Sequence, residues 1–117
     1  MTYYSVRMRT GRRLDAKDVY DLLRTVPEGQ VTTYGDLAKA LGFPGAARAI
    51  GRIMNANPDP IVVPCHRVVS SDGSIGGYGF GIKMKKEILA KEGLQFDGDA
   101  IVDFEKKRAV LKLKREK

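Results

Sequence analysis

The only cysteine of the sequence stands directly before its only histidine, as Cys65 and His66, and Arg67 follows. A thiolate is a strong nucleophile, and nearby positive charge favours it over the thiol. Pro64 and the apolar run at 61–63 place the cysteine at the end of a short buried strand, where side chains are often presented to a cleft. A single intracellular cysteine is more commonly buried and inert, but the neighbouring histidine favours an activated nucleophile.

An acidic residue extends this constellation from a distant part of the chain. The pattern predicts a helix over 83–91, with Met84, Ile88 and Glu92 on one stripe and Lys85 facing elsewhere. Glu92 is then either a frayed last turn that reaches solvent or a buried acid that needs a partner. In the second case the acid orients the histidine and the histidine takes the thiol proton. Adjacent cysteine and histidine side chains seldom touch, so we expect a water to bridge them.

Composition excludes several classes of protein. The 117 residues suit one domain, and a single cysteine cannot form an internal disulfide. A structural zinc site needs four ligands, and this sequence supplies only one cysteine and one histidine. Neither a metal nor a cofactor is therefore expected. No apolar run approaches the ~20 residues of a membrane helix, and the start of the chain does not resemble a signal peptide.

We therefore expect a monomer without membrane association, located in the cytoplasm (and on the nucleoid in a prokaryote). The net charge of +7 favours nucleic acid or another polyanion as a partner, or else serves solubility alone.

Three helices are expected in the first half of the chain, and the second and third of them must position this chemistry. The first is expected over 15–25, with Asp15 as its N-cap. Thr33 followed by Asp36 is a capping signal for a second helix that ends at Leu41. A short glycine-containing turn then leads into the next helix.

That next helix, from Ala46 to about Asn55, completes the pattern of a helix-turn-helix. In such a unit the second helix enters a DNA groove. Arg48 and Arg52 lie four residues apart and share one face of it. The alternative is a solvated basic face on an ordinary helical hairpin.

The second half is rich in glycine and then in basic residues. Five glycines fall within 73–81, around Tyr78 and Phe80, which is typical of a close approach to a ligand or to another backbone. No Gly-Lys-Ser/Thr follows, so this is not a phosphate-binding loop. A small hairpin with an Asp-Gly turn is expected over 96–101, and a frayed helix or basic tail over 106–117.

These motifs together resemble the O6-alkylguanine-DNA alkyltransferase family, whose active-site signature is similar to Pro64-Cys65-His66-Arg67-Val68. Four further blocks follow in the family's order, namely Thr33–Ala38, Ala46–Gly51, Asn55–Pro58 and Leu89–Gly93. The similarity spans about 15–104, between an N-terminal arm or strand at 1–14 and a basic C-terminal tail at 105–117. It implies a mainly α domain with short strands, winged helix-turn-helix-like, that corresponds to the C-terminal active-site domain alone.

The resemblance implies direct-reversal DNA repair by a methylated-DNA–protein-cysteine methyltransferase. O6-alkylguanine is flipped out of double-stranded DNA, and Cys65 takes the alkyl group irreversibly in a single turnover. His66 would act as the base through a water, with Glu92 holding it. Asn57 would tie the recognition helix to the active-site strand. Tyr34 would help rotate the nucleotide and stabilise the departing guanine.

The resemblance also assigns the surfaces for the base and for DNA. Arg48 would fill the gap left by the flipped base. The backbone carbonyls of Cys65 and Val68 would accept hydrogen bonds from the guanine amino group. The base pocket is assigned to Met54, Val68, Tyr78 and Gly79, and the remaining DNA contacts to Thr33, Ala47 and Arg52.

Three other interpretations compete with repair by transfer. Alkyltransferase-like proteins are similarly short, bind the lesion and recruit other repair factors, but typically carry Trp or Ala in place of the reactive cysteine, so Cys65 argues against them. A helix-turn-helix regulator leaves the cysteine–histidine pair, the glycine loop and Glu92 unexplained. A cysteine hydrolase lacks a second histidine and an obvious oxyanion loop.

Overall fold

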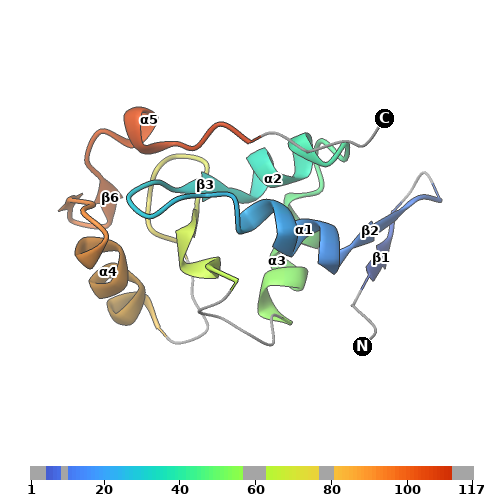
Figure 1. Cartoon of the computed structure of the whole chain (residues 1–117), viewed down its shortest axis with the longest axis horizontal. Helices are drawn as coiled ribbons and strands as arrows, with labels where there is room; N and C mark the ends of the chain where they lie inside the picture. The colour runs from blue at the N-terminus through green and yellow to red at the C-terminus, as the bar shows by residue number, and fades with distance from the viewer. Residues whose placement is uncertain (1–4, 9–10, 57–62, 77–80, 112–117) are drawn as a thin grey trace.

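A computed structural model shows helices joined by short strands, which confirms the expected fold class (Figure 1). The structure describes residues 5–8, 11–56, 63–76 and 81–111. In chain order the elements are β1 (Ser5–Arg7), β2 (Arg13–Asp15), α1 (Ala16–Leu23), β3 (Thr32–Thr33), α2 (Tyr34–Ala40), α3 (Ala47–Asn55), a 3₁₀ turn η1 (Cys65–Arg67), β4 (Val68–Val69), α4 (Ile82–Lys91), β5 (Phe96–Asp97), β6 (Ala100–Ile101) and α5 (Phe104–Lys107). None of the helices in these ranges has the length and apolar character needed to cross a bilayer.

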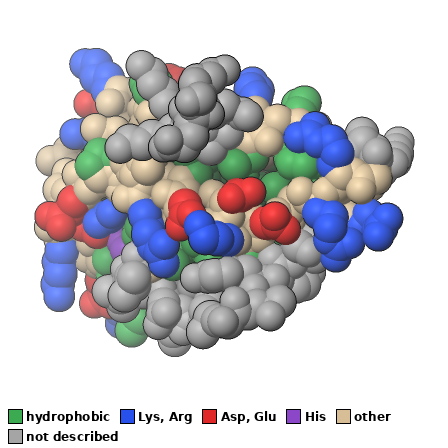
Figure 2. All heavy atoms as spheres, turned by 45° about the vertical axis from the view of Figure 1, so that its right-hand side comes forward, with side chains coloured by type: hydrophobic (Ala, Val, Ile, Leu, Met, Phe, Trp, Pro, Cys, Tyr) green, Lys and Arg blue, Asp and Glu red, His purple; other side chains and the backbone are tan. Residues whose placement is uncertain are grey.

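The N-terminal strands β1 and β2 form an antiparallel hairpin at one end of the molecule (Figure 1). Leu14 of β2 is buried, whereas its neighbours Arg13 and Asp15 face solvent. This alternation follows from the two-residue period of a strand with one packed face. Lys and Arg side chains, rather than Asp and Glu, mark the right-hand edge of Figure 2, where this end of the molecule comes forward.

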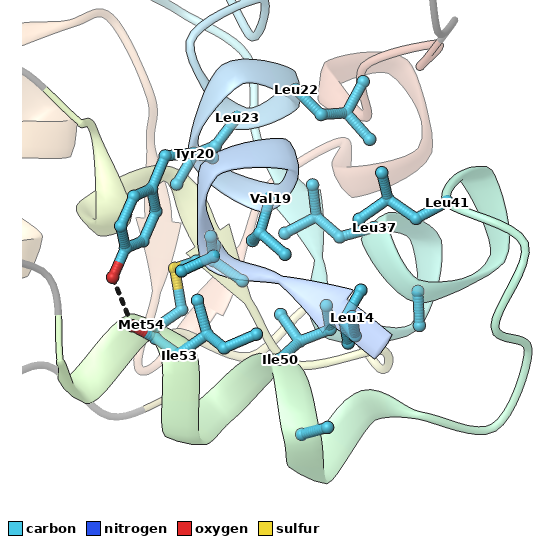
Figure 3. Close-up of a cluster of buried hydrophobic side chains, with 14 of the residues drawn as sticks. Leu14, Val19, Tyr20, Leu22, Leu23, Leu37, Leu41, Ile50, Ile53 and Met54 are labelled. Carbon is cyan, nitrogen blue, oxygen red and sulfur yellow. Dashed lines mark hydrogen bonds between the residues drawn. The ribbon is translucent and has the colours of Figure 1, made fainter. Parts of the chain in front are cut away.

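Helices α1, α2 and α3 share one hydrophobic core (Figure 3). Leu23, Leu37 and Ile50, one from each helix, are fully buried. Burying such a side chain contributes about 1.5–3 kcal/mol. The Tyr20 hydroxyl lies within this core and donates a 2.8 Å hydrogen bond to the Ile53 carbonyl, which ties α1 to the last turns of α3. The three helices therefore form one packed unit, with α2 and α3 arranged as the expected helix-turn-helix.

The capping signals differ in how they are used. The Asp36 N–H donates to the Thr33 hydroxyl oxygen at 3.0 Å, so the predicted cap of α2 is confirmed. Asp15 occupies the N-cap position of α1 with extended backbone, as predicted, but its side chain makes no capping hydrogen bond to the helix. A residue of capping type thus marks the start of both helices, and only one of them caps through its side chain.

The short strand β3 pairs in parallel with β4, with Thr32 opposite Val68. This pairing joins the entrance of the helix-turn-helix to the segment that directly follows Cys65. A backbone ladder extends the pair on the other side, where the Val31 N–H donates to the Lys107 carbonyl at 2.8 Å and the Ala109 N–H donates to the Val31 carbonyl at 2.7 Å.

That ladder changes the picture of the C-terminal segment. The sequence predicted a basic tail or a frayed helix there, and the structure shows one helical turn, α5, followed by residues that pack on the domain. Ala109 is buried and Leu111 packs against the core. Residues 112–117 lie outside the described residues.

The predicted hairpin over 96–101 is confirmed as β5 and β6, paired Phe96 with Ile101 and Asp97 with Ala100. The predicted Asp-Gly turn is one position too early, because Asp97 ends β5 and the turn residues are Gly98 and Asp99. Gly98, in the two-residue turn, has φ +63, a left-handed conformation that glycine adopts without strain.

The strand predicted directly before the cysteine is wrong where it can be checked. Val63 and Pro64 lie in a turn, Cys65 begins the 3₁₀ turn η1, and the strand follows at Val68. Residues 61 and 62 lie outside the described residues. The turn forms because the Arg67 N–H donates to the Pro64 carbonyl at 2.9 Å, and proline pre-sets the backbone for a tight turn.

The predicted inward stripe of α4 is also partly wrong. Met84 is 47% exposed, whereas Lys85 is completely buried together with Leu89. The helix is turned so that Lys85, Leu89 and Glu92 share the inner face, at a spacing of four and then three residues. A lysine can occupy this face because its four-carbon stem is apolar. Glu92 nevertheless lies inward, as predicted.

Candidate active site

Cys65 begins the 3₁₀ turn η1, which packs against α4. Its side chain is half-buried, and its N–H donates to the Val63 carbonyl at 2.7 Å. The turn leads directly into β4, whose pairing with β3 fixes its position relative to α2. The predicted nucleophile is therefore held between the helix-turn-helix and α4.

The Glu92 carboxylate receives hydrogen bonds from the two residues that follow Cys65. Nε2 of His66 lies 2.9 Å from one carboxylate oxygen. Arg67 donates through Nε at 2.9 Å and through Nη2 at 2.8 Å, one bond to each oxygen. Its remaining Nη1 donates to the Val26 carbonyl at 2.9 Å. Glu92 is thus a buried acid with two partners, and the frayed-turn alternative is excluded.

Electrostatics keeps this carboxylate ionised. Burial raises the pKa of Glu92, but the hydrogen bonds and charges of Arg67 and His66 outweigh it, so the pKa lies below its usual value. An ionised carboxylate accepts only, so Nε2 of His66 must carry a proton. In the neutral imidazole the other nitrogen, Nδ1, is then the acceptor. Nδ1 is buried and has no hydrogen-bond partner among the described residues.

Arg67 was predicted only as a positive neighbour of the cysteine, and its hold on Glu92 was missed. The two residues are 25 positions apart, so no local pattern connects them. The signal was the inward position of Glu92 itself, because a buried carboxylate needs a cation or several donors nearby.

Lys85 is the second residue that the sequence analysis missed. Its ammonium donates a 2.7 Å hydrogen bond to the Val68 carbonyl. Burial lowers the pKa of Lys85 to about 8, and the negative charge of Cys65 opposes this shift. The amine therefore lies within electrostatic reach of the thiol, and it occupies a carbonyl that the family resemblance assigns to the base.

Tyr34, the first residue of α2, also lies within electrostatic reach of the Cys65 thiol. Burial raises the pKa of its hydroxyl, and the negative charge of Cys65 raises it further. The phenol therefore stays protonated at neutral pH and can donate a hydrogen bond. The structure thus brings together five of the chemistry-bearing residues, which are Tyr34, Cys65, His66, Lys85 and Glu92.

The predicted DNA-facing residues lie on a different surface. Arg48 and Arg52 are exposed on α3, opposite the side chains that α3 buries in the core. Ala47 is half-buried at the start of the helix. Thr33 is buried and its hydroxyl caps α2, so the role visible in the fold is structural.

The residues assigned to the base pocket are only partly described. Met54 and Val68 are buried. Asn57, Tyr78 and Gly79 lie outside the described residues, and their roles stay predictions. Within the described ranges, no group of three or more His, Cys, Asp or Glu side chains is arranged to hold a metal ion.

Fold and site together define a class of protein. It is a helix-turn-helix domain that carries a cysteine–histidine–glutamate site beside the core that its helices share. The family model described as "6-O-methylguanine DNA methyltransferase, DNA binding domain" matches residues 16–94. This range is more than half of the chain, so the chain belongs to that family.

Individual relatives agree with this assignment. The chain is 49% identical over 84 residues to the methylated-DNA–protein-cysteine methyltransferase of Shigella flexneri, covering 72% of this chain and 49% of that protein. It matches the crystal structure of Mycobacterium tuberculosis OGT in complex with DNA with a TM-score of 0.64 and 44% identity, over 66% of this chain and 48% of that one. The chain thus spans about half the length of these relatives.

A shorter neighbour matches more of its own length. The structure of S. pombe Atl1 in complex with damaged DNA containing O6-carboxymethylguanine aligns with a TM-score of 0.69 and 28% identity. The alignment covers 81% of this chain and 94% of that one.

Proposed function

We propose that the protein repairs DNA by direct reversal, flipping O6-alkylguanine out of the duplex and transferring the alkyl group to Cys65. It would correspond to the active-site domain of the longer methyltransferases. The observation that carries the proposal is the arrangement around Glu92, an ionised carboxylate 2.9 Å from the histidine that follows the only cysteine. A structural cysteine does not need such an arrangement, whereas an activated nucleophile does.

The transfer balances without a cofactor, because the alkyl acceptor is the protein's own thiol. His66 takes the thiol proton through a water at Nδ1, and the ionised Glu92 stabilises the resulting imidazolium. The thiolate attacks the alkyl carbon, so an S–C bond forms and the C–O6 bond breaks. The electron pair leaves with the guanine, which requires the proton that the thiol lost. The thioether product has no good leaving group, so each molecule acts once.

Tyr34 and Val68 would act on the guanine. The protonated Tyr34 hydroxyl, whose pKa is raised by burial, would donate to the departing base. The Val68 carbonyl already accepts from Lys85, and its second lone pair, with the carbonyl of Cys65, would accept from the guanine amino group. Met54, Tyr78 and Gly79 would complete the pocket, and Asn57 would connect it to the recognition helix.

Access to the base requires nucleotide flipping, because a nucleophile cannot reach an atom inside the stack. Flipping costs a few kcal/mol, which an inserted side chain partly offsets. Arg48 is exposed on α3 and is the side chain proposed to enter the gap. Ala47 and Arg52 would contact the surrounding duplex, and Thr33, which is buried, would contribute by capping α2.

The decisive experiment measures intact mass after incubation with a duplex that contains one O6-methylguanine. We expect a gain of about 14 Da, one methylene, on Cys65, as for any covalent transfer to a nucleophile. The gain should be absent with Cys65→Ala and with an unmodified duplex. Tight binding of the lesion without a mass change would indicate an alkyltransferase-like protein, and no preference for the lesion would exclude both functions.

We also propose that the protein acts as a monomer in the cytoplasm, or on the nucleoid in a prokaryote. The chemistry fits this location, since the thiol must stay reduced until it meets its substrate. Light scattering of the protein with and without duplex would show a dimer if the monomer proposal is wrong.

A further inference from the structure

The hairpin β1–β2 carries a concentration of positive charge that the proposed chemistry does not use. Its described residues include three exposed arginines, Arg7, Arg12 and Arg13, against one acid, Asp15. The strand register places Arg7 directly opposite Arg13. Like charges in directly opposite positions disfavour a strand pair, and a polyanionic partner would offset this cost.

The hairpin is fixed to the core side of the recognition helix. Leu14 of β2 belongs to the same buried cluster as Ile50 of α3, and the two side chains lie close together in Figure 3. Because side chains alternate along a strand, the burial of Leu14 directs Arg13 outward. The outward face of the hairpin is therefore held at a set position relative to α3.

A second contact joins the hairpin to the turn of the helix-turn-helix. The Arg12 guanidinium lies 4.4 Å from the centroid of the Phe43 ring, within the range of a cation–π interaction. Met8 and Arg12 line a hollow of about 560 Å³ together with residues 42–46, which lead into α3. The hairpin thus flanks the N-terminal end of the recognition helix.

Both elements carry exposed positive charge. Arg48 and Arg52 are exposed on α3, and the hairpin adds its arginines at the end of the molecule that Figure 2 brings forward. An α3 of nine residues is only about 13 Å long, whereas the molecule extends over 41 Å. Duplex DNA carries one charge per about 1.7 Å, so a bound duplex presents phosphates well beyond the reach of α3.

We propose that the β1–β2 hairpin is a second DNA-contacting element, in which Arg7 and Arg13 bind backbone phosphates of the duplex beside the lesion. The contact lies on the side of the N-terminal end of α3, and Arg12 positions the hairpin through Phe43. This inference rests on the proposed function and deepens it, because it assigns a sequence-independent contact outside the recognition helix.

The test compares two double variants that remove the same charge. Arg7→Gln with Arg13→Gln removes the outward arginines of the hairpin. Lys91→Gln with Lys106→Gln removes two exposed lysines at the end of α4 and on α5, which lie at the opposite end of the molecule from the hairpin (Figure 1). Affinity for an unmodified duplex of about 20 base pairs, or two helical turns, is measured as a function of salt concentration.

Each phosphate contact contributes about 0.9 to the slope of log K against log salt concentration. We expect the hairpin variant to lower the slope by about 1.8 and the control variant to leave it near the wild-type value. Replacing both residues by lysine should preserve the slope, because the charge is kept. Equal slopes for the hairpin and control variants would overturn the proposal.

A second readout separates folding and chemistry from DNA contact. Methyl transfer from free O6-methylguanine base needs no phosphate contact, so its rate should be the same in the wild type and the hairpin variant. A slower reaction with the free base would show that the substitutions disturb the fold, and the lysine variant then decides. If the wild type never gains mass from a lesion duplex, the proposed function is wrong. The salt slopes still test whether the hairpin arginines contact DNA.

Discussion

The two charged regions of the molecule use the same kinds of side chain in opposite ways. Around Cys65, charges are buried, and each has a partner at less than 3 Å, as for Glu92 with Arg67 and Lys85 with the Val68 carbonyl. On α3, Arg48 and Arg52 are exposed. Buried charges depend on specific partners and resist salt, whereas exposed charges act through a shared field that salt screens.

This contrast has a functional meaning. Chemistry on one alkyl carbon requires a thiol, a base and a carboxylate at fixed positions, which only a packed environment provides. DNA backbone presents many equivalent phosphates, so exposed and redundant cations are sufficient to bind it. Substitutions in the first region should therefore be severe and specific, and those in the second graded and dependent on salt.

The largest effect is expected from Glu92→Gln. This substitution leaves Arg67 with an uncompensated charge in a mostly buried position, and breaking such a pair costs about 3–5 kcal/mol. It also removes the charge that would stabilise the His66 imidazolium and turns one of the two acceptor oxygens into a donor, so methyl transfer should slow as well. Urea unfolding measures the first effect, and the rate of mass gain on Cys65 measures the second.

Glu87→Gln provides the matched control, since Glu87 lies on the same helix and is exposed. We expect it to change the free energy of unfolding by less than about 0.5 kcal/mol. If the two variants unfold at the same urea concentration, Glu92 contributes no more to stability than an exposed glutamate does, and the expected difference between the two regions is wrong.

A smaller effect is expected from the titration of Lys85. Its pKa is lowered by burial to about 8 in the folded protein, from 10.5 in the unfolded chain. Between these values the unfolded chain binds more protons, so folding stability rises with pH by up to about 3 kcal/mol. In Lys85→Met, which has no group to titrate, this rise should disappear.

The measurement is the difference in free energy of unfolding between wild type and Lys85→Met from pH 7 to 10. All other titratable groups remain in both proteins, so the difference reports Lys85 together with its coupling to Cys65. A difference that stays constant with pH would mean that burial does not lower the pKa of Lys85.

Arg48→Ala probes the exposed region through function rather than stability. Because the side chain is proposed to fill the gap left by the flipped base, its loss should slow methyl transfer in duplex DNA by roughly ten- to hundredfold, or about 1.4–2.7 kcal/mol. Reaction with free O6-methylguanine base should be unaffected. Equal loss on both substrates would remove the proposed role, and Arg52→Ala tests whether any exposed arginine of α3 has the same effect.

The contrast between regions also explains what the sequence could predict. The helix-turn-helix followed from local signals, such as the Thr33 cap and the glycine turn, which act over a few residues. The spacing from Ile88 predicts that Glu92 lies inward, whereas in the structure Glu92 shares the inner face with Lys85 and Leu89. The rotation of α4 could not be predicted, because the acceptor that makes a buried Lys85 favourable is the carbonyl of Val68, 17 residues away.

The same reasoning applies to the segments that were misplaced. The C-terminal segment at 107–109 forms an isolated bridge with Val31 across more than 70 residues, and backbone pairing leaves little trace in side-chain pattern. Val63 of the predicted strand at 61–63 lies instead in a turn before η1, and η1 depends on the hydrogen bond from the Arg67 N–H to the Pro64 carbonyl. Both cases depend on backbone hydrogen bonds, which the side-chain pattern does not reveal.

The smallest effect tests a position between the two regions. Arg108 donates to both oxygens of Asp36, at 2.7 and 2.9 Å, and connects the C-terminal segment to α2. The hydrogen bond from Arg108 holds the pKa of Asp36 below its usual value, so the pair stabilises the fold above the unfolded pKa and is lost as the pH falls below it. With about a third of the Arg108 side chain exposed, Asp36→Asn should cost about 1 kcal/mol at neutral pH.

The salt dependence of stability shows whether the Arg108–Asp36 pair behaves as an exposed or as a buried ion pair. In urea unfolding at high salt, the difference between wild type and Asp36→Asn should shrink, because the pair is partly open to solvent. The corresponding difference for Glu92→Gln should persist, and Asp97→Asn, on the exposed hairpin β5–β6, should show no difference at either salt concentration. If the Asp36 difference persists in full, Arg108 behaves as a buried partner, and the protected network then extends from the thiol site along β3 to the C-terminal segment at Arg108.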